Sequence, residues 1–192
     1  MTQKTIITNG KFVTPLGVKH GDLEIVDGKI VSIAEKLQTQ KSDLVFDAGN
    51  RYVLPGLIET HGHFREPGFE HKEDIVHGTR AALAGGFTTV FDMPNTKPPI
   101  TAVLLLKDQI ARYKEKSYCD FAINFGSAVE NILELEIVDP RDITGVKVFT
   151  AGHQTTPTTI PKLSDQAKIW EIAARRGFPV LVYPSSSGLQ LI

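Results

Sequence analysis

The pattern of hydrophobic and polar residues divides the chain into two parts near Pro55. In the first part, short runs rich in branched residues alternate with turn-forming pairs, which is typical of β-strands. Asn9-Gly10 and Asp27-Gly28 are pairs that favour tight hairpin turns. We therefore expect residues 1–54 to form a small β-rich segment.

The second part, residues 55–192, alternates between strand-like and helix-like segments. Gly85-Gly86 predicts the end of the first helix, and Thr101 and Ser164 are expected to cap two later helices. This repetition predicts a parallel sheet with helices on its faces. The expected order is a strand leading from Leu57 into the residues around His61, a helix at 72–84, a strand at 87–93, a helix at 101–116, a strand at 119–125, a helix at 129–137, a strand at 145–149, a helix at 164–176 and a strand at 179–182.

The positions of the polar residues distinguish two parallel architectures. A doubly wound sheet usually carries a glycine-rich phosphate-binding turn after its first strand, and Thr60-His-Gly-His63 is not such a turn. Ligand-type residues instead follow the C-terminal ends of successive strands, where (β/α)8 barrels of the TIM type carry their chemistry. A complete barrel needs roughly 250 residues, so residues 55–192 predict an α/β fold with the N-terminal part of a barrel, about four and a half strand–helix units.

Composition excludes several classes of protein. The formal net charge is −1 and the pI is near 6.6, which gives no support for a nucleic-acid partner or for binding to a membrane surface. No apolar run reaches the length of a membrane span, and the first residues lack the apolar core of a signal peptide. The single cysteine, Cys119, excludes an intramolecular disulfide. We expect a cytoplasmic protein.

The strongest candidate site begins with His61-Gly62-His63. Side chains alternate along a strand, so two histidines one residue apart project from the same face and can bind one metal ion. The same alternation places Arg65 on this face, where its planar guanidinium suits a carboxylate. The alternatives are two partly exposed histidines with ordinary hydrogen bonds, and an arginine that is only a surface charge.

Lys147 interrupts the apolar run Gly145-Val-Lys-Val-Phe149, a strand expected to be buried on both faces. A lysine at a strand end commonly extends its charge to solvent. Burial would instead lower its pKa, and a neutral amine can take up CO₂ to become a carbamate, which binds metal through oxygen. Asn95 is either a turn residue or a donor to a substrate amide or carboxylate. His153 lies in a loop near the expected site, and Asp92 is assigned a structural role.

Together these segments resemble the dihydroorotase branch of the amidohydrolase superfamily. The resemblance covers nearly the whole chain, from residue 4 to about 182, and the motifs occur in the order found in that family. Related allantoinases usually carry asparagine at the position of Arg65, and hydantoinases lack the Arg-Glu-Pro-Gly sequence that begins there. The matching segments are Leu54–Gly68, Gly85–Val90, Asp92–Thr96 and Gly145–Phe149.

The resemblance implies a zinc-dependent hydrolase of pyrimidine biosynthesis that interconverts dihydroorotate and N-carbamoyl-aspartate. It implies a pair of zinc ions in a complete site. His61 and His63 would bind one zinc, and carboxylated Lys147 would bridge to the second. Arg65 and Asn95 would bind the carboxylate of this small-molecule substrate. The β-rich segment would belong to a small β-sandwich that a C-terminal segment completes.

The chain departs from the family pattern near its end. The family places a histidine at the end of the fifth strand, where this chain has Tyr183, whose phenol titrates near pH ~10 and is a poor metal ligand at neutral pH. A further histidine and a catalytic aspartate have no counterpart, so no catalytic residue is assigned. We expect a family member shortened after its first half, with one zinc or none and negligible activity. Its expected partner is a second copy in a homo-oligomer or the missing barrel half. The alternatives are a non-catalytic remnant or assembly partner, and an allantoinase- or hydantoinase-type activity.

Overall fold

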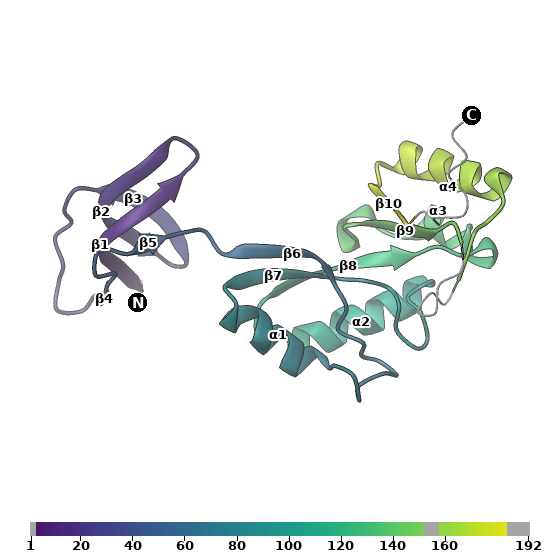
Figure 1. Ribbon diagram of the computed structural model, residues 1–192, viewed down its shortest axis with the longest axis horizontal. Coiled ribbons are helices and arrows are strands. Elements are labelled where there is room, and N and C mark those ends of the chain that lie inside the picture. The colour runs from purple at the N-terminus through teal and green to yellow at the C-terminus, as the bar shows by residue number, and fades with distance from the viewer. Residues whose placement is uncertain (1–2, 152–157, 184–192) are drawn as a thin grey trace. The chain divides into compact units, whose positions relative to one another are not determined.

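Residues 3–151 and 158–183 are described by a computed structural model, and they fall into two compact units that divide between Pro55 and Gly56. The first unit contains only strands, and the second alternates strands and helices (Figure 1). No helix in the described part of the chain is long and apolar enough to cross a membrane.

The first unit is a five-stranded sheet. Its strands are β1 (Lys4–Thr14), β2 (Gly17–Val26), β3 (Lys29–Ala34), β4 (Leu44–Asp47) and β5 (Tyr52–Val53). β1 lies inside the sheet, antiparallel to β2 and parallel to β4 and β5, while β3 extends the sheet beyond β2. Ile6, Phe12 and Leu23 are its buried apolar residues. The predicted β-rich character of this segment is therefore correct.

One of the two predicted turns in this unit is wrong. Asp27 and Gly28 have φ angles of 49° and 76° and connect β2 to β3 as a hairpin, as predicted. Asn9 also has a positive φ, 54°, but the chain continues through it as one strand with an irregular register. The Asn9 N–H donates to Asp22 on β2 over 3.0 Å. The bulge at Asn9 is thus stabilised by a neighbouring strand, which a local turn signal does not reveal.

The second unit contains a parallel sheet whose strands follow one another in chain order. They are β6 (Leu57–Gly62), β7 (Phe87–Asp92), β8 (Asp120–Gly126), β9 (Gly145–Phe149) and β10 (Val180–Tyr183). Each strand pairs with the next one in the sequence, and all four pairs are parallel. A doubly wound sheet reverses its strand order at a switch point, and this sheet does not. Its topology is that of part of a barrel.

The helices connect these strands. They are α1 (Ile75–Ala84), α2 (Val103–Lys116), α3 (Glu134–Ile137) and α4 (Leu163–Arg176). The predicted caps Thr101 and Ser164 are wrong, because Ala102 and Lys162 occupy the cap positions and provide no side-chain hydrogen bond. Glu134 instead accepts the Val103 N–H over 2.8 Å. The helix predicted at 129–137 is a short 3₁₀ turn, Val129–Asn131, followed by α3.

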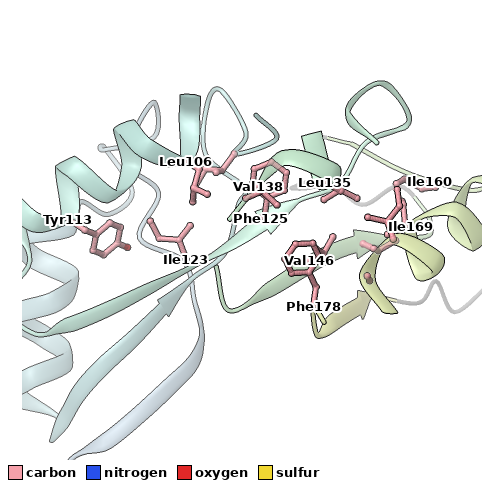
Figure 2. Close-up of a cluster of buried hydrophobic side chains, with 14 of the residues drawn as sticks. Leu106, Tyr113, Ile123, Phe125, Leu135, Val138, Val146, Ile160, Ile169 and Phe178 are labelled. Atoms are coloured by element: carbon pink, nitrogen blue, oxygen red, sulfur yellow. The ribbon is translucent and has the colours of Figure 1, made fainter. Parts of the chain in front are cut away.

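The helices pack against the sheet through one apolar core (Figure 2). Leu106 and Tyr113 of α2 lie near Ile123 and Phe125 of β8, while Ile169 of α4 belongs to the same cluster. All five residues of β9 are buried. This packing fixes the strands that carry or directly precede the candidate site residues.

Candidate functional site

Two histidines stand at the C-terminal end of β6. His61 is the last residue but one of the strand, and His63 directly follows it; their ring centroids are 5.3 Å apart with an interplanar angle of 65°. The pKa of each ring lies below the ordinary value, chiefly because partial burial disfavours the charged form, and the positive charge of Lys147 acts in the same direction. Both shifts favour the neutral ring, which is the form that binds metal ions.

Asn95 contacts one of these rings. Its Oδ1 lies 2.9 Å from His63 Nδ1, and its side chain is buried in the loop after β7. When the amide oxygen faces the ring, Nδ1 carries the proton and Nε2 remains available to a ligand. The sequence suggested a contact between Asn95 and the substrate. The structure adds an orienting contact to His63.

Lys147 lies in the middle of β9 and is only 3% exposed. The alternative of a lysine that extends to solvent from a strand end is therefore wrong. Burial lowers the pKa of its amine, and its positive charge lowers the pKa of both histidines, so the amine lies near them. Aromatic rings of Phe149 and Tyr183 lie 5.4 and 5.8 Å from Nζ. Among the residues described, no carboxylate forms an ion pair with this lysine.

Arg65 does not continue the strand, which corrects the expected alternation. β6 ends at Gly62, and Arg65 has a φ of 61°. Its positive charge nevertheless contributes to the lowered pKa of His63, so the guanidinium lies near that ring. Within residues 3–151 and 158–183, no side-chain hydrogen bond or ion pair engages this guanidinium. The group is available to an anionic ligand.

The described residues fit a metal site only in part. Within the described ranges, no three histidine, cysteine, aspartate or glutamate side chains gather as a metal-binding group. A metal ion would need an oxygen ligand on Lys147 in addition to the two imidazoles. Tyr183 ends β10 in register with Phe149, beside the Lys147 amine. His153, also considered from the sequence, lies outside the described residues.

Two buried polar residues, Asp92 and Gln109, hydrogen-bond to the backbone on either side of Arg65 and were not predicted as part of the site. Gln109 on α2 donates through Nε2 to the Glu66 carbonyl over 2.7 Å and to Asp92 Oδ2 over 3.1 Å. Asp92 Oδ1 accepts the Phe64 N–H over 3.3 Å. Burial raises the pKa of Asp92 to about 7. The sequence signal was a glutamine in the apolar stripe of a helix, three residues after Leu106 and four before Tyr113.

Comparison with known proteins places this arrangement in a family. A model described as the amidohydrolase family matches residues 52–172. A dihydroorotase of Syntrophotalea carbinolica is 40% identical over 159 residues, covering 78% of this chain and 36% of that protein. A dihydroorotase of Anaeromyxobacter dehalogenans is 39% identical over 140 residues, covering 70% of this chain and 32% of its own length. The chain thus spans about a third of the length of the curated relatives it matches.

Solved structures show the same fold. An L-hydantoinase (dihydropyrimidinase) from Arthrobacter aurescens superposes with a TM-score of 0.86 at 22% identity, covering 95% of this chain and 41% of that one. A D-hydantoinase superposes with a TM-score of 0.75 at 28% identity, covering 95% and 40%. These superpositions confirm the predicted fold class, the N-terminal part of an amidohydrolase barrel with a β-sandwich segment.

Proposed function

Since the chain belongs to the amidohydrolase family, we propose that its site is the first half of a dihydroorotase-type centre of pyrimidine biosynthesis. Such a centre interconverts dihydroorotate and N-carbamoyl-aspartate. The observation that carries the proposal is Arg65, a guanidinium that has no acidic partner among the described residues and lies beside His63. Dihydroorotate and N-carbamoyl-aspartate carry carboxylates, which a guanidinium binds through paired hydrogen bonds. The dihydroorotase names of the curated relatives support the same class.

The residues of this chain bind and orient the substrate in the proposed reaction. Arg65 holds the carboxylate. Asn95 orients His63 through its amide oxygen and offers its amide N–H to the substrate. In hydrolysis, water adds to the cyclic amide carbon, the carbon–nitrogen bond breaks, and the released nitrogen takes a proton. Ring closure uses the same steps in reverse. We assign no acid or base to the described residues.

The same residues would hold zinc. The ring centroids of His61 and His63 lie 5.3 Å apart, and their lowered pKa favours the neutral form. The lowered pKa of Lys147 likewise favours an uncharged amine. That amine can combine with CO₂ and release a proton, which would leave an anionic carbamate whose oxygen could bind metal together with the histidines. Bound zinc would supply a water molecule of lowered pKa and would polarise the amide carbonyl.

The 192-residue chain by itself is proposed to bind one zinc at most and to turn over no substrate. The described residues provide two imidazoles and one lysine, and no further histidine joins them. Among the described strands, β6 and β10 each pair on one side only. A second copy or a polypeptide carrying the remaining strands would complete the sheet, and native mass measures whether this occurs.

A second candidate is a hydantoinase-type activity on an uncharged ring. The matched solved structures favour it, because they are hydantoinases. A third is a non-catalytic remnant, which would hold no metal. The three candidates differ in metal content and in whether the ligand must carry a carboxylate.

Ligand binding to the zinc-loaded chain separates these candidates. We expect calorimetry to detect dihydroorotate, and Arg65→Met should weaken this binding by about tenfold or more, a loss typical of a charged hydrogen bond. Arg65→Lys keeps the charge but loses the planar fork, so it should recover only part of the affinity. Tighter binding of hydantoin than of dihydroorotate, or equal binding by wild type and Arg65→Met, would overturn the assignment. Absence of bound zinc would favour the remnant.

A further inference from the structure

Arg65 has a backbone conformation that arginine rarely adopts. Its φ is 61°, and the other described non-glycine residues with positive φ are Asn9, Asp27 and Asn50, which are types that tolerate this region. The Glu66 N–H donates to the Phe64 carbonyl over 2.7 Å. A hydrogen bond that spans one residue of positive φ defines the rarer, strained form of γ-turn. Such a turn persists where surrounding structure holds it.

Both ends of this γ-turn are held by one buried pair, Asp92 and Gln109. The Phe64 N–H donates to Asp92 Oδ1 over 3.3 Å, and the Glu66 carbonyl accepts from Gln109 Nε2 over 2.7 Å. Gln109 Nε2 also donates to Asp92 Oδ2 over 3.1 Å. Gln109 is 1% exposed and Asp92 is fully buried, so water does not compete for these hydrogen bonds.

The side chains on either side of Arg65 are anchored as well. The ring of Phe64 packs so closely that a Cβ added to Gly62 or Gly78 would lie 2.5 or 2.6 Å from it. The Glu66 carboxylate accepts the Ile75 N–H over 3.1 Å and pairs with Lys116. Phe64 and Glu66 therefore point into the protein, and Arg65 between them remains partly exposed.

We propose that Gln109 is a positioning residue for the anion-binding arginine. Its hydrogen bonds go to Glu66 and Asp92 rather than to the histidines or the guanidinium. Gln109 acts by holding the γ-turn from which Arg65 presents its guanidinium beside His63. This inference rests on the proposed function, in which Arg65 binds the substrate carboxylate.

The variant Gln109→Met tests the proposal, because methionine has a similar length and no donor. In the zinc-loaded chain, the Kd for dihydroorotate should rise about tenfold or more, while the Kd for zinc changes by less than about threefold. In a background of Arg65→Met, the same change should add less than about twofold, because its effect passes through Arg65. If Gln109 has a merely structural role, Gln109→Met should weaken the binding of both zinc and dihydroorotate, and its effect should add to the loss of affinity caused by Arg65→Met.

Gln166→Met is the matched control. Gln166 is also a buried helical glutamine, and its Nε2 donates to the Ile160 carbonyl over 2.8 Å, away from the γ-turn. It should reduce stability but keep dihydroorotate affinity within about twofold of wild type. Equal affinities of Gln109→Met and Gln166→Met would overturn the proposal. If Gln109→Met does not fold, Gln109→Asn, whose amide is one methylene too short to reach both partners, takes its place with the same expectation.

Hydrogen exchange at the Glu66 N–H measures the γ-turn without any ligand. Exchange should be faster by about tenfold in Gln109→Met than in Gln166→Met, because the turn loses its support. If the wild type binds no dihydroorotate but exchange still accelerates, the proposed function is wrong and the positioning role stands for another anion. Unchanged exchange at Glu66 overturns the positioning role whatever the ligand.

Discussion

Replacing Asp92 with asparagine should change how the stability of the protein depends on pH. Asp92 is fully buried, and burial raises the pKa of its carboxyl from 3.8 to about 7. Hydrogen bonds from the Phe64 N–H and Gln109 oppose this rise, because they favour the ionised form. Burial outweighs them, so the protein carries a titrating group inside its core near neutral pH.

The sign follows from which state holds the proton. Between pH 3.8 and about 7, the folded protein keeps a proton that the unfolded chain has released. The free energy of unfolding therefore falls as the pH rises through this window. Each unit is worth about 1.4 kcal/mol, and the carboxyl is half ionised at its pKa, so Asp92 should remove about 2 kcal/mol of stability between pH 5 and pH 7.

Asparagine has nearly the same shape and cannot ionise, so Asp92→Asn should lack this loss. Its amide would direct an N–H at the Gln109 donor, and the unpaired contact should cost about 1–3 kcal/mol at every pH. Relative to wild type, the variant should therefore gain about 3 kcal/mol of stability between pH 5 and pH 8. Urea unfolding at pH 5, 6, 7 and 8, followed by circular dichroism, measures this difference.

Asp108→Asn provides the control, because Asp108 is an exposed carboxylate that pairs with Arg112 on the surface of α2. Its difference from wild type should stay flat over the same pH range. If Asp92→Asn instead remains parallel to wild type within about 1 kcal/mol, the Asp92 carboxyl is ionised throughout, and the argument from burial is wrong.

Two further predictions concern the same unit. Lys147→Met should be more stable than wild type at neutral pH, because burial lowers the pKa of Lys147. The folded protein then holds the Lys147 proton less tightly than the unfolded chain, so wild-type stability should rise as the pH approaches 10.5. The difference in stability between Lys147→Met and wild type should therefore shrink between pH 7 and pH 10, as thermal unfolding in CO₂-free buffer would show. A difference that grows over this range would contradict the argument. Gly78→Ala should cost about 1–3 kcal/mol of stability, although alanine has a higher helix propensity than glycine. The reason is that its Cβ would lie 2.6 Å from the Phe64 ring. Gly85→Ala is the comparison, because its Cβ would lie no closer than 3.4 Å to its neighbours. Equal urea midpoints for the two variants would contradict the prediction, because they would show that the Phe64 ring moves aside at little cost.

The order of strands and helices in the second unit follows from the sequence, because hydrophobic periodicity and turn residues are local properties. β9 and α4 lie within one residue of their predicted bounds. Local sequence signals cannot distinguish two structural elements that have the same backbone geometry at one residue. A positive φ at Asn9 is compatible with a hairpin turn or with a bulge, and only the pairing of β1 with β2 decides between them.

The sequence also determined which of these side chains lie in the strands or directly after them. His61 and His63 lie together because they follow one strand, and Lys147 is buried because its strand is apolar on both sides. Arg65 was expected on the same face by alternation, and it lies near His63 by a different route, a γ-turn after the strand has ended.

Only the tertiary structure decided what holds these side chains in place. The hydrogen bond from Gln109 to the Glu66 carbonyl joins residues 43 positions apart, and the contact between His63 and Asn95 joins residues 32 positions apart. The first contact requires α2 to pack near the end of β7, and the second requires β6 and β7 to lie side by side. Local sequence patterns therefore indicate which side chains form the candidate site, whereas contacts that hold them, such as the buried pair of Asp92 and Gln109, form only when the helix meets the sheet.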